Sequence, residues 1–295
     1  MNSSNSKVYG LIIIATVFWG MNFALAGAIL QDMSPHWSAA LRFVLSALIM
    51  IAVAMWRREP LVAPALRYMG VYFVIGAVGI GGFNLLFFQA MQTTSAGNAS
   101  LIMATNPLLT TVLAAWVLGE RASRRFLLSL PLALVGVVVV ISGGNMSKLT
   151  HLQDVRGDLL MLGANLAWAG YIVMSRKWMP KQSALTNTTL LMSAGALILL
   201  VVALLSGEQM TAVGLYAGIN LAIMVLGGTV LAYLFWNEGI AQLGAGRTAL
   251  FLNLVPVFAM LTAAVMGALP NMAQIIGGIL VISSVAMVML PALKS

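Results

Sequence analysis

The feature that most constrains this chain is a proline-containing apolar stretch that occurs twice, 149 residues apart. Pro107 lies near the centre of residues 95–125, and Pro256 lies at the equivalent place in the second occurrence. The same offset, applied without gaps, aligns Trp19 with Trp168. Because the chain has only 9 prolines and 7 tryptophans, the agreement of both pairs in one register indicates a duplication. We therefore expect two copies of one folding unit.

The apolar composition decides the environment of both copies. Hydrophobic residues make up 61% of the chain, charged residues make up 7%, and the mean hydropathy is +1.00, so a water-soluble surface cannot be built from it. A helix needs about 20 apolar residues to cross a bilayer. The fold class is therefore predicted to be an all-α integral membrane protein with ten transmembrane helices. These are expected at 8–30, 36–56, 68–90, 95–118, 124–142, 157–177, 185–206, 216–239, 245–267 and 271–290.

The ten segments divide into two groups of five, which sets the topology. The first repeat is expected at residues 1–142, a linker at 143–156 and the second repeat at 157–295. Since five is odd, the second copy enters the membrane from the opposite side, which gives two inverted-topology five-helix repeats. With the N-terminus inside, twelve of the 15 Lys and Arg residues fall on the cytoplasmic side, as the positive-inside rule expects. Both termini are then cytoplasmic, and the net charge of +8 indicates membrane orientation and not a nucleic-acid partner.

Inverted repeats are a recurring construction of secondary transporters, whose substrate binds near the midplane between the repeats. Helices interrupted at corresponding positions point to that site, so we expect Pro107 and Pro256 to act as coupling or gating positions in alternating access. An intramembrane enzyme would need a nucleophile–base pair, a carboxylate dyad or a metal cluster, and the sequence offers none. No catalytic residue, metal site or cofactor is therefore expected. An uncoupled facilitator or a channel-like protein for small solutes is the alternative.

Several motifs resemble one transporter family, the EamA-type transporters of the drug/metabolite transporter superfamily. The motifs that resemble its first repeat are Trp19-Gly20-x-Asn22-Phe23, Arg42-Phe43 and the stretch from Asn106-Pro107 to Leu118-Gly119-Glu120-Arg121. Trp168 and Pro256 resemble the second repeat. The resemblance implies export or exchange of small organic metabolites, often amino acids, across a bacterial-type inner membrane. One departure is Gly-Ala-Leu-Pro at 267–270, where the family often repeats its Leu-Gly-Glu corner, so no function is assigned there.

Polar and aromatic side chains near mid-depth supply the candidate substrate-binding residues. Amides buried in a membrane need partners, so they face other helices or an internal cavity. For each candidate singly, helix-to-helix bonding or packing is the commoner explanation, whereas together they favour a pocket. A mostly apolar pocket with a few fixed amides suits a neutral, zwitterionic or aromatic solute better than a metal ion. The candidates are Trp19, Asn22, Arg42, Asn84, Asn106, Trp168, Tyr171 and Tyr233.

Two ionisable side chains within the apolar segments each have two interpretations. Glu238 either pairs with Arg247 across a tight turn or serves as a proton-coupling or gating group. Arg42 either pairs with Asp32 or receives an anionic group such as a substrate carboxylate, which suits the planar guanidinium. The expected partners are therefore a small-molecule substrate and the lipid bilayer.

Overall fold

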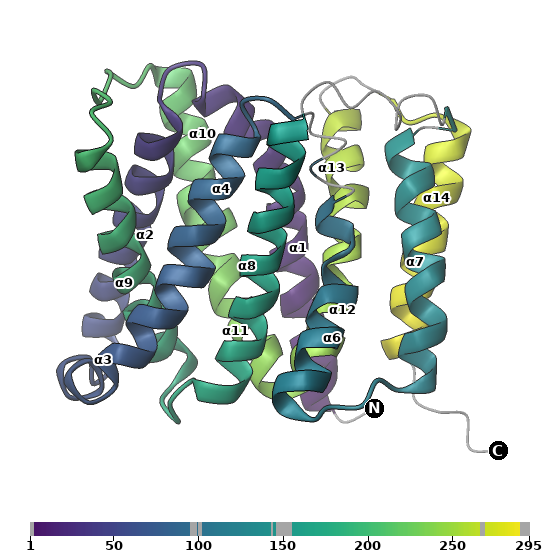
Figure 1. The fold of residues 1–295 in the computed structure, drawn as a ribbon, viewed down its shortest axis with the longest axis horizontal. Helices are drawn as coiled ribbons and strands as arrows, with labels where there is room; N and C mark the ends of the chain where they lie inside the picture. The colour runs from purple at the N-terminus through teal and green to yellow at the C-terminus, as the bar shows by residue number, and fades with distance from the viewer. Residues whose placement is uncertain are drawn as a thin grey trace.

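The computed structural model describes residues 3–94, 99, 102–142, 144–145, 155–265 and 269–289. Every regular element within these residues is a helix (Figure 1). Most of the predicted linker at 143–156 and two residues of the second-repeat corner, 267 and 268, lie outside the described residues, as does residue 266. The first half contains α1 (Ser3–Ile29), α2 (Pro35–Trp56), α3 (Val62–Gly76), η1 (Ala77–Gly82), α4 (Phe83–Ala90), α6 (Asn106–Leu118) and α7 (Arg124–Ser142). The second half contains α8 (Val155–Trp178), α9 (Ala184–Leu205), α10 (Leu215–Val225), η3 (Leu226–Leu231), α11 (Ala232–Leu243), α12 (Ala245–Leu250), η4 (Phe251–Asn253), α13 (Leu254–Val265) and α14 (Met272–Met289).

The helices have the length and the surface of membrane-spanning segments. Among the described residues, seven helical segments are long and apolar enough to cross a membrane, and Ile102–Leu118 and Met272–Met287 are shorter apolar helices. Large apolar side chains face outward, since Trp116, Leu215 and Val265 are 85%, 83% and 90% exposed. Such a surface suits hydrocarbon and not water. The chain is thus a multi-pass membrane protein, and the count of ten crossings stays a prediction.

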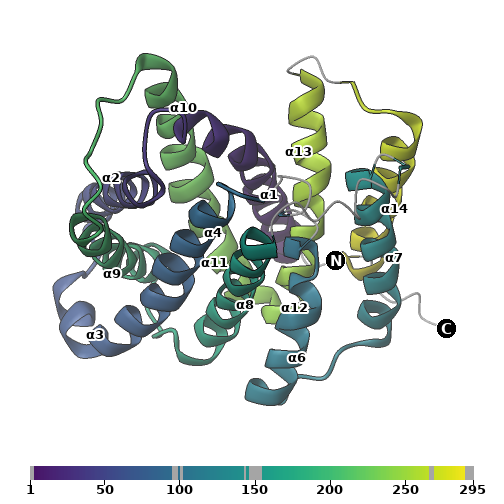
Figure 2. The same cartoon turned by 45° about the horizontal axis from the view of Figure 1, so that its top comes forward.

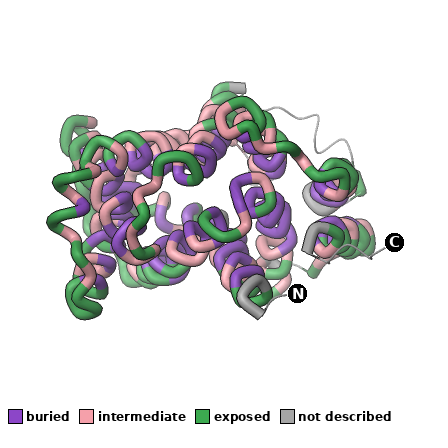
Figure 3. Tube along the Cα trace, turned by 90° about the horizontal axis from the view of Figure 1, so that it is seen from below, coloured by how far each residue is buried: buried purple, intermediate pink, exposed green. Residues whose placement is uncertain are grey.

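The two halves interlock in a symmetric pattern. Helix α1 packs against α11 and α13, and α8 packs in the equivalent way against α4 and α6. Helix α2 packs against its equivalent α9, and α7 packs against its equivalent α14 at the other end of the molecule (Figure 2). Buried residues gather on the inner sides of the helices, and exposed residues follow the perimeter (Figure 3). The contacts of α1 and α8 therefore bring the two halves together in the interior.

A π-helical turn interrupts an equivalent helix in each copy. Turn η1 begins at Ala77 and η3 begins at Leu226, an offset of 149 residues. In each turn a glycine lets the backbone approach a neighbouring helix closely. A Cβ on Gly79 would lie 2.2 Å from Tyr171 Cδ2, and a Cβ on Gly228 would lie 2.2 Å from Asn22 Oδ1. Each π-helical turn is thus seated against α8 or α1 of the opposite copy.

The two prolines lie directly after breaks in their helices. Thr105 forms a turn and α6 begins at Asn106, so Pro107 occupies the first helical turn. There its missing N–H removes no helical hydrogen bond. In the second copy the 3₁₀ turn Phe251–Asn253 separates α12 from α13 shortly before Pro256. The turn at Thr105 precedes Pro107 by two residues, and the 3₁₀ turn ends three residues before Pro256.

Candidate functional site

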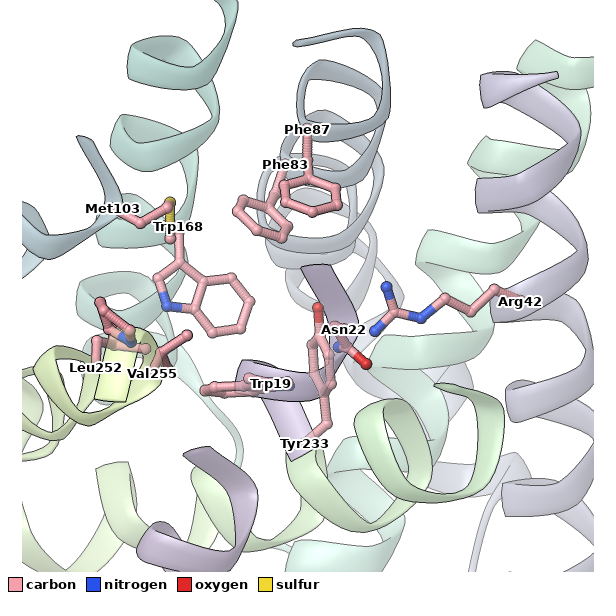
Figure 4. A pocket seen from close by; sticks show the side chains of 11 residues that line it. Trp19, Asn22, Arg42, Phe83, Phe87, Met103, Trp168, Tyr233, Leu252 and Val255 are labelled. Atoms are coloured by element: carbon pink, nitrogen blue, oxygen red, sulfur yellow. The ribbon is translucent and has the colours of Figure 1, made fainter. Parts of the chain in front are cut away.

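A cavity lies between the two halves of the molecule (Figure 4). Its space is about 640 Å³, including the part that opens to solvent. Five of the eight candidate binding residues and one of the two prolines contribute to its wall. The lining residues are Trp19, Asn22, Arg42, Phe83, Phe87, Met103, Trp168, Tyr233, Leu252, Val255 and Pro256.

Aromatic rings form much of the cavity wall. Trp19 and Trp168, which are equivalent in the repeat, meet edge to face with ring centroids 5.3 Å apart. Tyr233 lies 6.0 Å from Trp19 and 5.6 Å from Trp168 by the same measure. Phe83 lies 5.0 Å from Trp168. Rings in these arrangements stabilise one another beyond their burial. The wall therefore fits the flat or apolar part of an organic molecule.

Arg42 brings a positive charge to the cavity although it is only 4% exposed. Its Nε donates to Thr229 Oγ1 at 2.7 Å, and its Nη2 donates to the Gly228 carbonyl at 3.1 Å. With the Asn22 amide oriented to satisfy both of its neighbours, Asn22 Oδ1 accepts from Arg42 Nη2 at 3.2 Å. All three acceptors are neutral. The guanidinium is therefore hydrogen-bonded but not neutralised by these contacts.

The alternative in which Arg42 pairs with Asp32 is wrong. Asp32 Oδ2 accepts from the Gly214 N–H at 3.0 Å, and the Asp32 carbonyl accepts from Thr211. Asp32 follows α1 and turns toward the segment before α10, whereas Arg42 is two turns into α2 and reaches η3. Within the described residues no carboxylate forms an ion pair with Arg42.

Comparison with known proteins identifies the family. A model of the EamA-like transporter family matches residues 6–142 and again residues 155–290. The chain belongs to the EamA-like transporter family. The resemblance inferred from its motifs is thereby confirmed.

Relatives extend over nearly the whole of this EamA-like chain. It is 36% identical over 282 residues to the uncharacterized transporter YyaM of Bacillus subtilis, with 95% of this chain and 92% of the relative covered. It is 28% identical over 284 residues to a probable amino-acid metabolite efflux pump of Salmonella typhimurium, with 92% and 91% covered. A solved crystal structure at 21% identity superimposes with a TM-score of 0.76 over 96% of both chains, which shows the shared fold.

Three candidate residues of the EamA-like transporter lie outside the cavity wall. Asn106 Nδ2 donates to Asn165 Oδ1 at 2.7 Å and to the Asn165 carbonyl at 3.1 Å, which joins α6 to α8. The Tyr171 hydroxyl donates to Asn237 Oδ1. Asn84 donates to a carbonyl one turn earlier in its own segment, at 2.9 Å. Asn106 and Tyr171 therefore join neighbouring helices, whereas the bond of Asn84 stays within its own segment.

Glu238 and Pro107 also lie outside the wall of this cavity. Glu238 accepts a hydrogen bond from Gln242, one turn further along α11. Arg247 is exposed on α12 and lines a second, polar cavity beside Arg121 and Arg176. The pairing of Glu238 with Arg247 is not formed in the described part of the chain. A coupling role for Glu238 stays a prediction.

Contacts between ionisable side chains join the first half to the second half at both ends of the bundle. Glu120 Oε1 lies 3.6 Å from Arg176 Nε, and His36 Nδ1 lies 2.9 Å from Glu208 Oε1. Partial burial acts to raise the pKa of the Glu208 carboxyl, but interactions with Ser34 and His36 outweigh it. The pKa of Glu208 is thus held below its ordinary value.

The sequence candidates omitted five of the apolar lining residues: Phe83, Phe87, Met103, Leu252 and Val255. Phe83 and Phe87 are one turn apart and share a helix face, which is a usable signal. Met103 and Leu252 are equivalent at the 149-residue offset, so either one could have identified the other. In a chain that is 61% hydrophobic, apolar residues that line a cavity carry no mark that separates them from lipid-facing ones.

Proposed function

We propose that this chain is a secondary transporter that exports small organic metabolites by alternating access. It consists of ten transmembrane helices in two inverted five-helix repeats, residues 1–142 and 157–295, joined by the linker 143–156. Both termini lie in the cytoplasm of a bacterial-type inner membrane. The directions of the helices support this, because α1 and its equivalent α8 run in opposite directions, and α1 begins on the side where α14 ends (Figure 1).

The observation that carries the proposal is a cavity lined by equivalent residues of both copies. Trp19 faces Trp168, and Met103 has its equivalent in Leu252 on the same wall. In inverted-repeat transporters the substrate binds at the repeat interface, and rocking of one half against the other opens the site to each side in turn. The helix breaks beside Pro107 and Pro256 supply positions where such bending is least restricted.

The proposed substrates are amino acids or related neutral, zwitterionic or aromatic solutes. Their apolar part packs against Trp19, Trp168 and Tyr233, while Asn22 and Arg42 receive polar groups. Asn106 and Tyr171 fix the helices around the site through their hydrogen bonds to Asn165 and Asn237, and Asn84 bonds within its own segment. The name of the Salmonella relative, a probable amino-acid metabolite efflux pump, supports this class.

An uncoupled facilitator is the second candidate function. The observation that favours it is that no acidic side chain is among the described residues lining the cavity. Proton-coupled transport relies on ionisable groups within the membrane, and Glu238 on α11 is the candidate for that role. A channel-like protein is the third and less favoured possibility, since paired interrupted helices are typical of carriers.

Counterflow in proteoliposomes tests the transporter proposal. We expect saturable uptake of at least one labelled amino acid or related metabolite from a panel, accelerated by unlabelled solute inside the vesicles. Trp168→Ala should lower this exchange by about tenfold or more, because a loss of about 1.4 kcal/mol of contacts already gives that factor. Trp116→Ala is the matched control, because Trp116 is 85% exposed on the outer surface. Flux that never saturates and shows no acceleration would sink the carrier proposal.

The same vesicles separate coupled from uncoupled transport. If a pH gradient drives accumulation in the wild type, and Glu238→Gln abolishes accumulation while exchange survives, Glu238 couples transport to protons. If flux only equilibrates and the variant behaves like the wild type, the protein is a facilitator.

A further inference from the structure

We propose that the cavity binds organic monocarboxylates, with the carboxylate against Arg42 and an apolar or aromatic body against Trp19 and Trp168, and that it discriminates against zwitterionic amino acids. This inference rests on the proposed function, because it assigns a substrate class to the same cavity. Among amino acids and related solutes, it favours the related anions, which carry no ammonium group beside the carboxylate, over the amino acids themselves.

The first argument is the balance of charge. Arg42 is 4% exposed and its acceptors are a hydroxyl, a backbone carbonyl and an amide. A buried charge without a counter-charge is strongly unfavourable, and in a membrane it marks a functional site by default. The described acidic side chains all have partners elsewhere. These are Gly214 for Asp32, Ser183 and Thr186 for Glu59, Arg176 for Glu120, Thr94 for Asp158, His36 for Glu208 and Gln242 for Glu238.

The second argument is the balance of hydrogen-bond donors and acceptors. The protein contacts of Arg42 use its Nε and Nη2, so Nη1 has no acceptor in the described part of the chain. Trp168 Nε1 is also buried without an acceptor. Asn22 Oδ1, a hydrogen-bond acceptor in the cavity wall, already accepts a hydrogen bond from Arg42. A ligand that brings an acceptor to Nη1 completes the hydrogen bonds of Arg42, and a carboxylate there also supplies the opposite charge.

The third argument concerns the ammonium group of an amino acid. That group is bonded to the carbon beside the carboxylate, so it cannot be kept away from Arg42 when the carboxylate binds there. It would lie near a like charge and would lose water without gaining a carboxylate partner, which is unfavourable. Cation–π attraction to the aromatic rings of the wall would offset part of this cost, but these rings carry no negative charge.

The position of Arg42 agrees with these three arguments. Figure 4 shows its guanidinium directed inward from α2, toward Asn22 and Tyr233. The aromatic wall then receives the remainder of the solute. A monocarboxylate therefore meets the charge at one side of the cavity and the rings at the other.

Binding to the purified full-length protein tests the proposal with four solutes that share a phenyl body. They are 3-phenylpropionate, phenylalanine, 3-phenylpropionamide and 2-phenylethylamine, and 4-methylpentanoate and leucine provide a second, aliphatic pair. Quenching of tryptophan fluorescence and the shift of thermal unfolding in detergent report binding. Binding is measured because the neutral forms of weak acids cross vesicle membranes unaided. We expect at least one carboxylate to bind about tenfold or more tightly than its amino acid, and the amide and amine to bind more weakly still.

Substitution of Arg42 then identifies the group responsible. Arg42→Gln should remove the preference for carboxylate over amide, whereas Arg42→Lys should keep part of it, because the charge stays while the hydrogen bonds that hold the guanidinium in place are lost. Arg67→Gln is the matched control, since Arg67 is an exposed arginine on α3 beside Tyr68 and away from the cavity.

The outcomes separate this inference from the proposed function. Equal or tighter binding of the amino acids by the wild type overturns the inference, whether or not any variant folds. Absence of carboxylate binding, or an unchanged preference in a folded Arg42→Gln protein, also overturns it. If amino-acid counterflow is present in those cases, the transporter proposal stands. Carboxylate preference without saturable counterflow of any solute would support the anion site and remove the transporter proposal.

Discussion

The two π-helical turns occupy equivalent places in the repeat but differ in the chemistry around them. Turn η1 packs against α8 and α9, with Gly79 under the ring of Tyr171. Turn η3 packs against α1 and α2, with Gly228 under the amide of Asn22. Tyr171 and Asn22 are themselves equivalent at the 149-residue offset. Backbone geometry is therefore shared by both copies, down to the place where a glycine meets the opposite helix.

The side chains beside the turns are not shared. Arg42 on α2 bonds to Thr229 in η3, whereas the equivalent residues Leu191 and Ile80 are both fully buried in the hydrophobic core. The same backbone arrangement thus forms with and without a charge. Because Arg42 also lines the cavity, we infer that its charge serves a ligand and is not needed for the fold.

The largest effect on stability is expected when a charge is placed at Leu191, the apolar equivalent of Arg42. Leu191→Arg would bury a guanidinium where Ile80 replaces the accepting hydroxyl of Thr229. We expect a loss of about 3–5 kcal/mol in the free energy of unfolding, since the new charge has no partner. Unfolding of the detergent-solubilised protein by added sodium dodecyl sulfate, followed by circular dichroism, measures it.

Leu191→Met is the control for that variant, because it conserves volume and should change the free energy of unfolding by less than about 1.5 kcal/mol. A Leu191→Arg protein as stable as the wild type would show that the packing around Leu191 and Ile80 does not require an apolar residue at position 191.

A smaller effect is expected from a methyl group on either glycine. In Gly79→Ala the Cβ would lie 2.5 Å from Tyr171 Cγ and 2.6 Å from Tyr171 Cβ, so the base of the ring must shift. We expect a loss of about 1–3 kcal/mol in the free energy of unfolding, as for other overpacked sites. Gly228→Ala meets the movable end of Asn22, so its stability loss should be smaller and its effect on carboxylate affinity larger. Equal losses of stability in the two variants would contradict this account.

Arg42→Leu places at position 42 the residue that its equivalent position 191 already has. This variant should change the free energy of unfolding less than the glycine variants do. Two of the three former acceptors keep other bonds, because the Thr229 hydroxyl donates to the Met224 carbonyl at 2.9 Å and Trp19 Nε1 donates to the Gly228 carbonyl at 3.0 Å. We expect a change within about 1 kcal/mol in the free energy of unfolding, since apolar replacement of a buried charge is often neutral. Carboxylate binding should be lost. A destabilisation of about 3 kcal/mol or more would make Arg42 structural and remove the contrast between the sides.

Sequence position predicts the parts of this site that depend on the repeat register. The approach of Trp19 to Trp168 and the helix breaks beside the two prolines belong to this group. The register does not predict which way a side chain turns. Asn106 faces Asn165 on α8 and not the cavity, because each amide gains hydrogen bonds there.

The hydrogen-bond acceptors of Arg42 could not be predicted from the sequence either, for a different reason. Among acidic residues, Asp32 is the nearest in sequence, and that proximity suggested it as a partner. The Arg42 side chain instead reaches the π-helical turn η3. There it donates to the Thr229 hydroxyl and the Gly228 carbonyl, which lie 187 and 186 positions later in the chain. No local pattern in Leu226–Leu231 predicts that turn, because its glycines are equally compatible with a regular membrane helix.

The smallest effect is expected at the ends of the two copies, where contacts between ionisable side chains are partly exposed. Since the pKa of Glu208 is held below its ordinary value, its pairing stabilises the fold fully above that ordinary value and is lost as the pH falls through the lowered pKa. The loss should be about 0.2–1 kcal/mol, as for other exposed pairs. Unfolding of the wild type and Glu208→Gln between about pH 7 and pH 3 measures it, and the variant should lack this acid-sensitive part. Because Trp37 Nε1 donates to the Glu208 backbone carbonyl at 2.8 Å, the variant keeps that link between α2 and the segment after α9. The same acid sensitivity in both proteins would mean that the His36–Glu208 pair contributes nothing to stability. The difference between Arg42 on α2 and Leu191 on α9 would then be the difference between the copies that affects stability.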